Sequence, residues 1–392
     1  MNLACEVCVL GAGPAGMVLA NILHGHGVDC IVVEKHLSEE TAQRGRAGLI
    51  DHPSISILKT HGLASQLLEN GLPHTRCEFR VFGEQFVLNY SSLADGCVHY
   101  IYPQQDLVRG LVETYQRQQG HIRFATEVTS VNSTNGPSVI CYDKKTGDHV
   151  NIRCDFVAGC DGFHGVSRRS IPDMDVNVFE SDLNFSWLAV LAETAPSTEH
   201  IIYAVHPNGF AGHMLRNKKV SRYYLQISSH DRLSDWPDER VWSELKLRMC
   251  KEDWRLQRGP VIEKQIVRMR NVVIEQLRHQ GLFLVGDSAH IITPTGGKGL
   301  NLAIQDAQAL AETIIAYYTT HDKPLLDQYS INRLPAIWRA QGFSSMFLDM
   351  LCRTAGAFEQ NRFARKLNLT RLLQIRDNED YARWFARRYV GA

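Results

Sequence analysis

The sequence lacks an excess of charge of either sign. Its 392 residues contain 42 Lys and Arg and 42 Asp and Glu, so no net field attracts nucleic acid or an anionic membrane surface. Long apolar runs are also missing, since no stretch approaches the roughly 20 residues that a membrane-spanning helix needs. These absences exclude a nucleic-acid-binding protein and an integral membrane protein, and they leave an ordinary globular protein that handles a small molecule.

The cysteines lack the dense, even spacing of a disulfide framework, although there are ten of them. Cys5 and Cys8 form a C-x-x-C motif, but the run around them is apolar, and alternate strand positions would point both into a core. The N-terminal segment has no basic region and contains Glu6, which argues against a secretion signal. We therefore expect a cytoplasmic protein without a metal site.

The sequence does have a glycine-rich turn near its start. The segment "CEVCVLGAGPAGMVLANILHGHGVDCIVVEK" (5–35) is typical of a strand, a turn, a helix and a second strand. Gly11, Gly13 and Gly16 would bring backbone N–H groups and a helix N-terminus toward a pyrophosphate. Glu34 ends the second strand about 20 residues later, where a carboxylate can accept hydrogen bonds from a ribose. This pattern predicts a dinucleotide site, the alternative being a tight turn without a ligand.

Two further segments leave a buried strand through an aspartate. "GDSAHIITPTGGKGLN" (286–301) passes from Asp287 into a glycine-rich helix start, whose N–H groups would face the negative charge of a reduced flavin ring. "GCDGFHGVSRRS" (159–170) has the same strand and turn, followed by a basic stretch. Each could be a structural loop, but the three motifs in this order favour a flavin-binding function.

The rest of the chain alternates helical and strand-like segments. Residues 104–120 and 299–318 have helical periodicity, 122–160 alternate like antiparallel strands around the turn "KKTGD", and 181–267 contain several strand-like runs. We see no repeats, low-complexity tracts or long linkers. An α/β (α+β) protein with interleaved domains is the expected architecture.

The three glycine and aspartate motifs together resemble the single-component flavoprotein aromatic hydroxylases. "RAGLIDHPSISILKTHGL" (46–63), "VAGCDGFHG" (157–165), "SRYYLQI" (221–227) and the tail "YVG" (389–391) extend the resemblance over the whole chain, and within the family they are most similar to the 4-hydroxybenzoate hydroxylases. The resemblance implies a discontinuous Rossmann-like FAD-binding domain, a substrate-binding sheet domain and C-terminal helices. The implied boundaries are 1–73, 98–180 and 268–345 for the first, 74–97 and 181–267 for the second, and 346–392 for the third.

The same resemblance implies which residues hold the cofactors. The FAD residues would be Gly11, Gly13, Ala15, Gly16, Glu34, Arg44, Arg46, Ala47, Gln104, Asp287, Leu300 and Asn301. The NADH or NADPH residues would be Lys35, His36, Glu40, Arg44, His164 and Arg270. A carboxylate at Glu40 would repel a 2′-phosphate and suit a free hydroxyl, whereas Lys35 and Arg44 pull the other way. We therefore favour NADH slightly.

The implied reaction reduces FAD with the nicotinamide, adds O₂ to form a flavin C4a-hydroperoxide, and hydroxylates a phenolic benzoate. Because a phenolate is a better nucleophile than a phenol, the site must help to remove the phenol proton. The implied proton relay consists of Tyr203, Tyr389 and His74, with the Pro294 carbonyl beside it. The implied substrate-binding residues are Arg216, Tyr224, Met214, Tyr203, Gly212 and Thr295.

Two of these positions depart from the family pattern. Met214 stands where the family has a serine that binds the substrate carboxylate, and Gly212 stands where it has a leucine. The reshaped pocket leaves two substrates open, 4-hydroxybenzoate itself or a 3-substituted analogue such as the 3-amino compound in a biosynthetic pathway. A non-catalytic FAD-binding protein is the alternative from another class. The resemblance also implies a homodimer.

The run "GFAGHMLRNKKVSRYY" (209–224) concentrates basic and aromatic side chains. It could be a solvated hairpin, a nucleic-acid patch or the wall of an anion pocket. The neutral overall charge argues against nucleic acid. We expect two strands joined by a turn, with Lys218 and Lys219 in solvent and Arg216 and Tyr224 facing the substrate.

Overall fold

The structure is a computed structural model that describes residues 1–41, 48–82, 84–134, 136–172, 174, 176–352 and 362–391. Three predicted cofactor residues, Arg44, Arg46 and Ala47, lie outside the described residues. The chain divides into two compact units, each assembled from three segments. Unit 1 comprises Met1–Gly71, Tyr102–Glu180 and Asn271–Gly342, and unit 2 comprises Leu72–Ile101, Ser181–Arg270 and Phe343–Ala392. The α/β (α+β) class is confirmed, whereas the three-part domain division stays a prediction.

Unit 1 is built on a six-stranded sheet. Its strands, in spatial order, are β19 (Arg278–His279), β20 (Leu282–Leu284), β13 (Phe156–Gly159), β2 (Val7–Leu10), β3 (Cys30–Val33) and β9 (His121–Arg123). All neighbouring pairs are parallel except β19 with β20. Every residue of the four central strands is buried, as expected for parallel strands covered on both faces.

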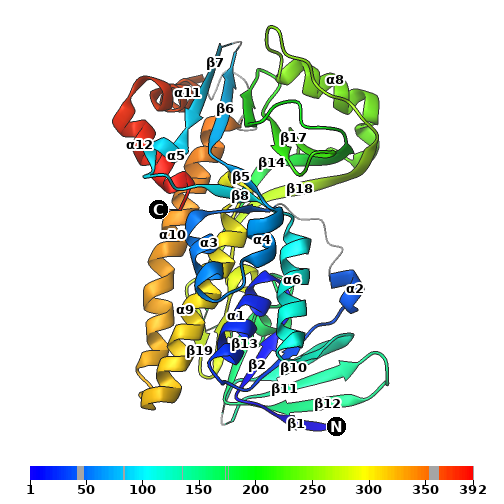
Figure 1. The fold of residues 1–392 in the computed structure, drawn as a ribbon, viewed down its shortest axis with the longest axis vertical. Helices are drawn as coiled ribbons and strands as arrows, with labels where there is room; N and C mark the ends of the chain where they lie inside the picture. Colours follow the sequence, from blue (N-terminus) through cyan, green and yellow to red (C-terminus); the bar gives the residue numbers. More distant parts are fainter. Residues whose placement is uncertain are drawn as a thin grey trace. The chain divides into compact units, whose positions relative to one another are not determined.

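Three helices of unit 1 pack together beside this sheet. They are α1 (Pro14–Gly25), α6 (Gln104–Arg117) and α9 (Lys298–Thr320), and α1 contacts both of the others (Figure 1). The Asn21 side chain of α1 donates to the Leu111 carbonyl of α6 at 3.1 Å, which fixes these two helices against each other. The shorter helices are α2 (Ser38–Thr41), α3 (His52–Thr60), α4 (Ser65–Asn70) and α7 (Val166–Arg169).

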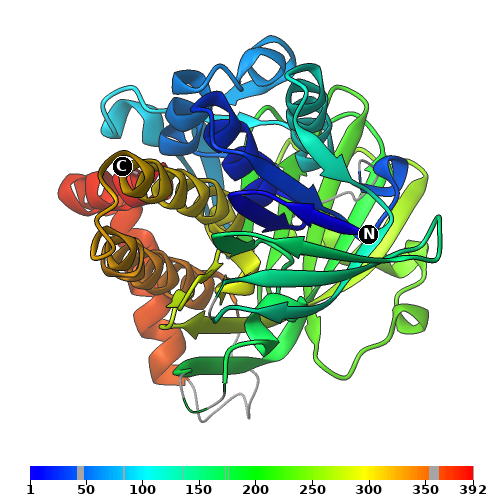
Figure 2. The same cartoon turned by 90° about the horizontal axis from the view of Figure 1, so that it is seen from below.

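A second sheet of unit 1 contains β1 (Asn2–Ala4), β12 (His149–Arg153), β11 (Ser138–Asp143) and β10 (Thr126–Asn132) in spatial order. The last three are antiparallel, which confirms the prediction for residues 126–153. The end of the range predicted as antiparallel, Phe156–Gly159, instead forms the parallel strand β13. The N-terminal strand β1 lies parallel to β12 at one edge (Figure 2). Glycine and aspartate at the turn between β11 and β12 supply the conformations that the reversal needs.

Unit 2 contains most of a long mixed sheet, in which Ile201–Val205 pairs in parallel with Arg76–Val81. The strands, in spatial order, are β18 (Val261–Ile274), β14 (Val178–Glu193), β17 (Val220–Ser228), β16 (Ala211–Leu215), β15 (Ile201–Val205), β6 (Arg76–Val81) and β7 (Glu84–Asn89). Helix α8 (Asp238–Arg248) covers one face, where Trp242 and Leu245 pack on Ile202 and Tyr223. The hairpin of β16 and β17 confirms the predicted two strands, with Lys218 and Lys219 exposed between them.

Smaller elements complete unit 2. They are β5 (Leu72–His74), β8 (His99–Ile101), α5 (Tyr90–Leu93), α11 (Arg362–Asp377), α12 (Glu379–Tyr389) and the end of α10 (Leu325–Leu351). Helix α12 packs on α5 (Figure 1). This contact brings Tyr389, at the end of α12, close to Tyr90 of α5, although the two residues are 299 positions apart in the sequence.

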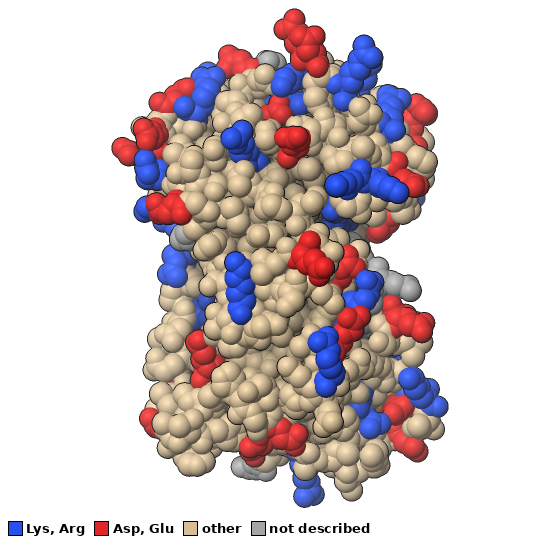
Figure 3. Space-filling model, viewed as in Figure 1, with Lys and Arg blue, Asp and Glu red and all other residues tan. Residues whose placement is uncertain are grey.

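The surface carries no large field of one sign on the face shown in Figure 3, where basic and acidic side chains are interspersed. This agrees with the neutral composition. Among the helices of the described residues, none is long and apolar enough to cross a membrane.

Candidate functional site

The predicted pyrophosphate turn lies between β2 and α1. Its three glycines differ in how much room a side chain would have at each position. Gly11 has φ of +100°, and a Cβ there would lie 2.6 Å from the Cys160 carbonyl oxygen. A Cβ on Gly16 would lie 2.0 Å from the Gly11 carbonyl oxygen, so the turn and the helix approach too closely for alanine. A Cβ on Gly13, the N-cap of α1, would meet nothing within 4 Å. The open side of the turn is therefore at Gly13, in front of the helix N-terminus.

Glu34 follows β3 and closes the same turn. Its carboxylate accepts from the Ala12 N–H at 2.8 Å and from the His36 N–H at 3.0 Å. It is buried, so these two bonds compensate its loss of water. Glu34 thus holds the glycine turn in shape, a function that the sequence motif alone did not reveal.

The predicted nicotinamide segment continues from Glu34 on the surface. Lys35 is exposed, and the Glu40 carboxylate lies 3.5 Å from His36 Nδ1 and accepts from the Leu37 N–H at 3.3 Å. His164 is exposed and its ring contacts the Phe163 ring. Arg270, in unit 2, is half-buried on β18.

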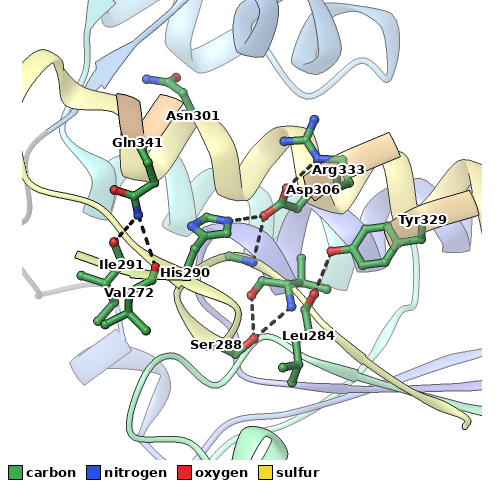
Figure 4. Close-up of polar contacts among 12 residues, drawn as sticks. Val272, Leu284, Ser288, His290, Ile291, Asn301, Asp306, Tyr329, Arg333 and Gln341 are labelled. Atoms are coloured by element: carbon green, nitrogen blue, oxygen red, sulfur yellow. Dashed lines mark hydrogen bonds and ion pairs between the residues drawn. The ribbon is translucent and has the colours of Figure 1, made fainter. Parts of the chain in front are cut away.

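The loop after β20 is held by a buried charge cluster on α9 and α10 (Figure 4). The Asp306 carboxylate of α9 accepts from the Gly286 N–H at 3.1 Å, lies 2.6 Å from His290 Nε2, and accepts from Arg333 Nε at 2.7 Å. Burial alone would raise the pKa of Asp306, but Arg333 and His290 outweigh burial and lower that pKa. Asp306 is therefore ionised, and it fixes the loop that presents Asp287.

The remaining loop contacts are to backbone groups (Figure 4). Ser288 Oγ donates to the Gly159 carbonyl at 2.5 Å, and Tyr329 Oη donates to the Leu284 carbonyl at 2.8 Å. Gln341 Nε2 donates to the Ile291 carbonyl at 2.6 Å. These bonds join the strand β20 and the loop to neighbouring elements, so that the half-buried Asp287 stands on a rigid support.

Four further predicted residues of unit 1 lie at the start of a helix. Gln104 begins α6. Pro294 and the buried Thr295 precede α9, where Gly296 and Gly297 have positive φ angles of 75° and 64°, and Leu300 is half-buried in the first turn of the helix. Two consecutive glycines are needed here because other residues rarely adopt this left-handed backbone.

Both side-chain amide atoms of Asn301 form hydrogen bonds to the backbone of the protein. Its Oδ1 accepts from the Asp51 N–H at 2.9 Å, and its Nδ2 donates to the carbonyls of Leu49 at 2.9 Å and Gly297 at 2.7 Å. The side chain therefore ties α9 to β4 (Leu49–Ile50) and to the glycine pair.

In unit 2, strand register aligns the predicted substrate residues on one face of the sheet. Tyr203 of β15 pairs with Gly212 of β16, which pairs with Tyr224 of β17. Met214 pairs with Arg222 two positions further along β16. Side chains opposite each other, or two residues apart, point to the same face, so all five residues face away from α8.

The space beside Gly212 is already filled. A Cβ on Gly212 would lie 2.8 Å from Phe210 Cζ. The Phe210 ring stacks on Trp187 with centroids 4.6 Å apart, and Trp187 also contacts the Tyr224 ring at 5.2 Å. Loss of a side chain at position 212 therefore does not by itself enlarge the pocket. Phe210 could not be predicted from the sequence, because nothing local shows that its ring turns back over position 212.

Tyr203 and Tyr389 form a direct hydroxyl pair. Their Oη atoms are 2.8 Å apart, and both side chains are buried. Arg216 and Tyr224, which are predicted to face the substrate, are also buried. Burial raises the pKa of Tyr203, Cys77 raises it further, and the bond with Tyr389 opposes both. Both tyrosines are therefore neutral hydroxyls in the protein alone.

His74, the third predicted relay residue, is bonded to Tyr90. His74 Nδ1 lies 2.9 Å from Tyr90 Oη, and Tyr90 Oη donates to the His74 carbonyl at 2.5 Å.

Tyr90 has no local sequence signal, because its partners lie on other elements. Asp306 does have one, since it occupies a position of α9 where helical spacing calls for an apolar residue.

Comparison with known proteins agrees with this arrangement. The sequence model of the FAD binding domain family matches residues 4–344. The chain is 36% identical over 390 residues to p-hydroxybenzoate hydroxylase of Acinetobacter baylyi, a match that covers 98% of this chain and 95% of the relative. The chain belongs to the flavoprotein aromatic hydroxylases. It is thus an FAD-dependent aromatic monooxygenase, a family whose reaction uses an aromatic substrate, O₂ and a nicotinamide cofactor.

Other members of the flavoprotein aromatic hydroxylases act on different compounds. The chain is 25% identical over 357 residues to a probable NADH-specific resorcinol 4-hydroxylase of Rhodococcus jostii, covering 85% of this chain and 63% of that protein. Its fold superposes with a TM-score of 0.83 and 18% identity on p-nitrophenol 4-monooxygenase of Pseudomonas putida, covering 100% of this chain and 99% of the other. Family membership therefore establishes the cofactor and the reaction class without establishing the substrate.

The residues present fit FAD. The helix N-terminus at Gly13 has open space in front of it, which a Cβ would fill, and N–H groups at such a terminus favour a diphosphate. Glu34, Gln104 and Asp287 are described residues that the sequence analysis assigned to this cofactor.

Proposed function

We propose that this flavoprotein hydroxylates a phenolic benzoate, either 4-hydroxybenzoate or a substituted analogue. The observation that carries the proposal is the buried hydroxyl pair of Tyr203 and Tyr389, 2.8 Å apart, on the sheet face that also bears Tyr224 and Met214. Bound FAD would accept hydride from a nicotinamide and activate O₂ for transfer to the ring. The chain itself must bind the phenol, orient it and take up its proton.

The tyrosine pair supplies the proton path. A substrate phenol that donates to Tyr203 Oη would be linked through Tyr203 to Tyr389. Because burial keeps the pKa of both tyrosines raised, neither holds a negative charge at rest. The phenol donates its proton to Tyr203, Tyr203 donates its own to Tyr389, and Tyr389 releases one proton to a water molecule. The substrate is left as a phenolate, whose ring is the better nucleophile.

The carboxylate end of the substrate is assigned to Arg216 and Tyr224. An arginine gives a charge-assisted hydrogen bond to a carboxylate, and the tyrosine hydroxyl adds a neutral one. Met214 supplies no donor at the position where a serine was expected, a loss of about 1.5–3 kcal/mol of binding if no other group replaces it. Met214 therefore favours a substrate with an added substituent, such as 3-amino-4-hydroxybenzoate, as the second candidate.

We also propose that NADH is preferred over NADPH. The Glu40 carboxylate is ordered at the start of α2 by the Leu37 N–H, and a fixed negative charge there repels a 2′-phosphate. The ratio of kcat/KM for NADH over NADPH should exceed one and should fall in the Glu40→Gln variant. A wild-type preference for NADPH would contradict this assignment.

A panel of benzoates tests the proposed substrate class. The FAD-loaded protein is mixed with NADH and O₂ in the presence of 4-hydroxybenzoate, 3-amino-4-hydroxybenzoate, 3,4-dihydroxybenzoate or benzoate. We expect a phenolic acid to stimulate NADH oxidation and to be hydroxylated in stoichiometric amount, and benzoate to give no product. Stimulation by non-phenolic acids alone would overturn the proton path through Tyr203.

In the same assay, Met214→Ser distinguishes the two candidate substrates. If this change improves turnover of 4-hydroxybenzoate, the native substrate is a different phenolic acid. If it leaves turnover unchanged or lowers it, Met214 is suited to 4-hydroxybenzoate itself.

A further inference from the structure

Four buried ring side chains of unit 2 form one group, in which Tyr90 contacts each of the other three. They are His74 of β5, Tyr90 of α5, His99 of β8 and Tyr389 of α12, and we refer to them as the ring cluster. Each is no more than 5% exposed. Of these four residues, only Tyr389 has a part in the proposed reaction, so His74, Tyr90 and His99 need an explanation.

The hydrogen bonds of His74 fix its tautomer. Its Nε2 lies 3.2 Å from the Ile201 backbone N–H, which can only donate, so Nε2 carries no proton. The proton of the neutral ring is then on Nδ1, and it donates to Tyr90 Oη at 2.9 Å. Tyr90 in turn donates its own proton to the His74 carbonyl at 2.5 Å. Donors and acceptors match at every step, and this match depends on the Tyr90 hydroxyl.

This bonding also reaches Tyr203. Ile201 begins β15, and Tyr203 lies two residues further along the same strand. The bond from the Ile201 N–H to His74 therefore holds the strand that carries Tyr203. Since Tyr90 holds the ring of His74, it acts on Tyr203 through His74 and Ile201.

Tyr389 is held by the same cluster. The Tyr90 ring meets the Tyr389 ring edge to face, with centroids 5.1 Å apart, and the His99 ring does so at 4.9 Å. His99 Nε2 donates to the Tyr389 carbonyl at 3.1 Å. Tyr90 thus contacts one member of the hydroxyl pair by its ring and supports the other through His74.

We propose that Tyr90 is a positioning residue for the hydroxylation, which holds His74 as the Nδ1–H tautomer and thereby aligns Tyr203 with Tyr389. The inference rests on the proposed function. It also assigns His74 a fixed structural tautomer, because protonation of Nε2 would break the bond to Ile201.

The groups around the cluster leave His74 neutral. Burial lowers the pKa of His74 to about 3, and the neighbouring His200 lowers it in the same direction. Burial raises the pKa of Tyr90, and Cys77 and Tyr203 raise it further. Burial also raises the pKa of Tyr389, and Tyr203, Cys77 and Tyr90 raise it further. His74, Tyr90 and Tyr389 therefore stay uncharged across roughly pH 5 to 8, the range in which an unperturbed histidine titrates.

Nitrogen NMR of the ¹⁵N-histidine-labelled protein tests the tautomer without any reaction. The signal of His74 is assigned by its absence from a His74→Gln variant. We expect the Nδ1–H tautomer in the wild type, with no titration across roughly pH 5 to 8, and a change of tautomer or a titrating signal in Tyr90→Phe. An Nε2–H tautomer in the wild type, or an unchanged spectrum in Tyr90→Phe, would overturn the proposal.

The effect on the reaction is measured with 4-hydroxybenzoate and the FAD-loaded protein. Tyr90→Phe keeps the ring that packs on Tyr389 and removes only the hydroxyl. We expect kcat to fall about tenfold, the loss of about one neutral hydrogen bond, and the pKa of the bound phenol, read from its phenolate absorbance, to rise. KM should change less than kcat because the carboxylate end is untouched.

Tyr223→Phe is the matched control. Tyr223 is buried in unit 2, and its hydroxyl donates to the Gln257 carbonyl on the face packed by α8. It should leave the phenol pKa and kcat unchanged. If Tyr90→Phe lowers only the melting temperature, as this control could, Tyr90 is merely structural. If the wild type neither hydroxylates 4-hydroxybenzoate nor forms its phenolate, the proposed function fails for this substrate, whereas the NMR result stands separately.

Discussion

The polar atoms of Asn301 are all bonded inside unit 1, to Asp51, Leu49 and Gly297. A ligand near this residue would meet the backbone that Asn301 arranges, not its amide. Glu34 has a similar double role, because its carboxylate already accepts from two backbone N–H groups. Side chains recognised by a sequence motif can thus act by shaping the backbone of a site as well as by touching the ligand.

Tyr203→Phe isolates the function of a single hydroxyl. The ring contacts with Phe79 and Phe347 remain, so the fold and substrate binding should persist. Without the hydroxyl that links the phenol to Tyr389, we expect hydroxylation to slow about 100-fold, a typical loss for an acid–base group. Product formation is measured together with NADH and H₂O₂. Continued NADH oxidation with H₂O₂ in place of product is the expected pattern; full hydroxylation would rule out the path through Tyr203.

Some residues could be identified from the sequence and others could not. The tight turn at Gly11 and Gly16 was predictable because the motif that specifies it lies within one strand–turn–helix segment. The close approach of Cys160 to Gly11 and the hydrogen bond that Glu34 accepts from the turn were not. Tyr90 was not, since its significance depends on Tyr389, which only the folded chain brings near. Phe210 was missed because the sequence shows that position 212 has no side chain but not which ring fills the space.

The glycine turn before α1 allows binding and folding to be separated. Gly16→Ala would place a Cβ 2.0 Å from the Gly11 carbonyl oxygen, whereas a Cβ on Gly13 meets nothing within 4 Å. We expect Gly16→Ala to lower the stability of the FAD-free protein. Gly13→Ala should melt like the wild type without FAD but bind FAD at least about tenfold more weakly, equivalent to about 1.4 kcal/mol.

Thermal melts of the FAD-free variants and fluorescence titration with FAD measure these two effects. Wild-type affinity in Gly13→Ala would mean that the diphosphate does not lie against this turn. Each glycine variant serves as the control for the other, because they differ by only three positions on the same element.

The loop that follows β20 is held by hydrogen bonds from Gly286 and His290 to the ionised carboxylate of Asp306. A carboxyl whose pKa is lower in the folded state stabilises the protein above its unfolded pKa of about 3.9, and this stability is lost as the pH falls further. Asp306→Asn should cost about 3 kcal/mol near neutral pH because Arg333 loses its buried counter-charge. The variant should also lose less stability on acidification than the wild type does.

Urea unfolding at neutral and acidic pH measures both changes. Asp327→Asn is the control, since Asp327 is an exposed partner of Arg278 in a surface ion pair, which contributes little to stability. Equal losses in the two variants would show that the Asp306 cluster is not what supports the loop.

For the whole molecule, the order of the motifs along the chain was enough to predict the class of fold and the cofactor. The central parallel strands of unit 1 are continuous apolar runs, and the antiparallel strands between residues 126 and 153 alternate, so each left its own periodicity in the sequence. The arrangement of the ring cluster and of the Asp306 cluster was not predictable, because each joins segments that are far apart in sequence. Long-range polar contacts of this kind leave no periodic signal.

The most direct test of the account is the origin of the oxygen atom in the product. The FAD-loaded protein is supplied with NADH, ¹⁸O₂ and the phenolic benzoate that stimulates it most, and the product is analysed by mass spectrometry. We expect one ¹⁸O atom per hydroxylated ring. Product without label, or NADH oxidation that yields only H₂O₂ with every phenolic benzoate tried, would contradict the proposed monooxygenase reaction.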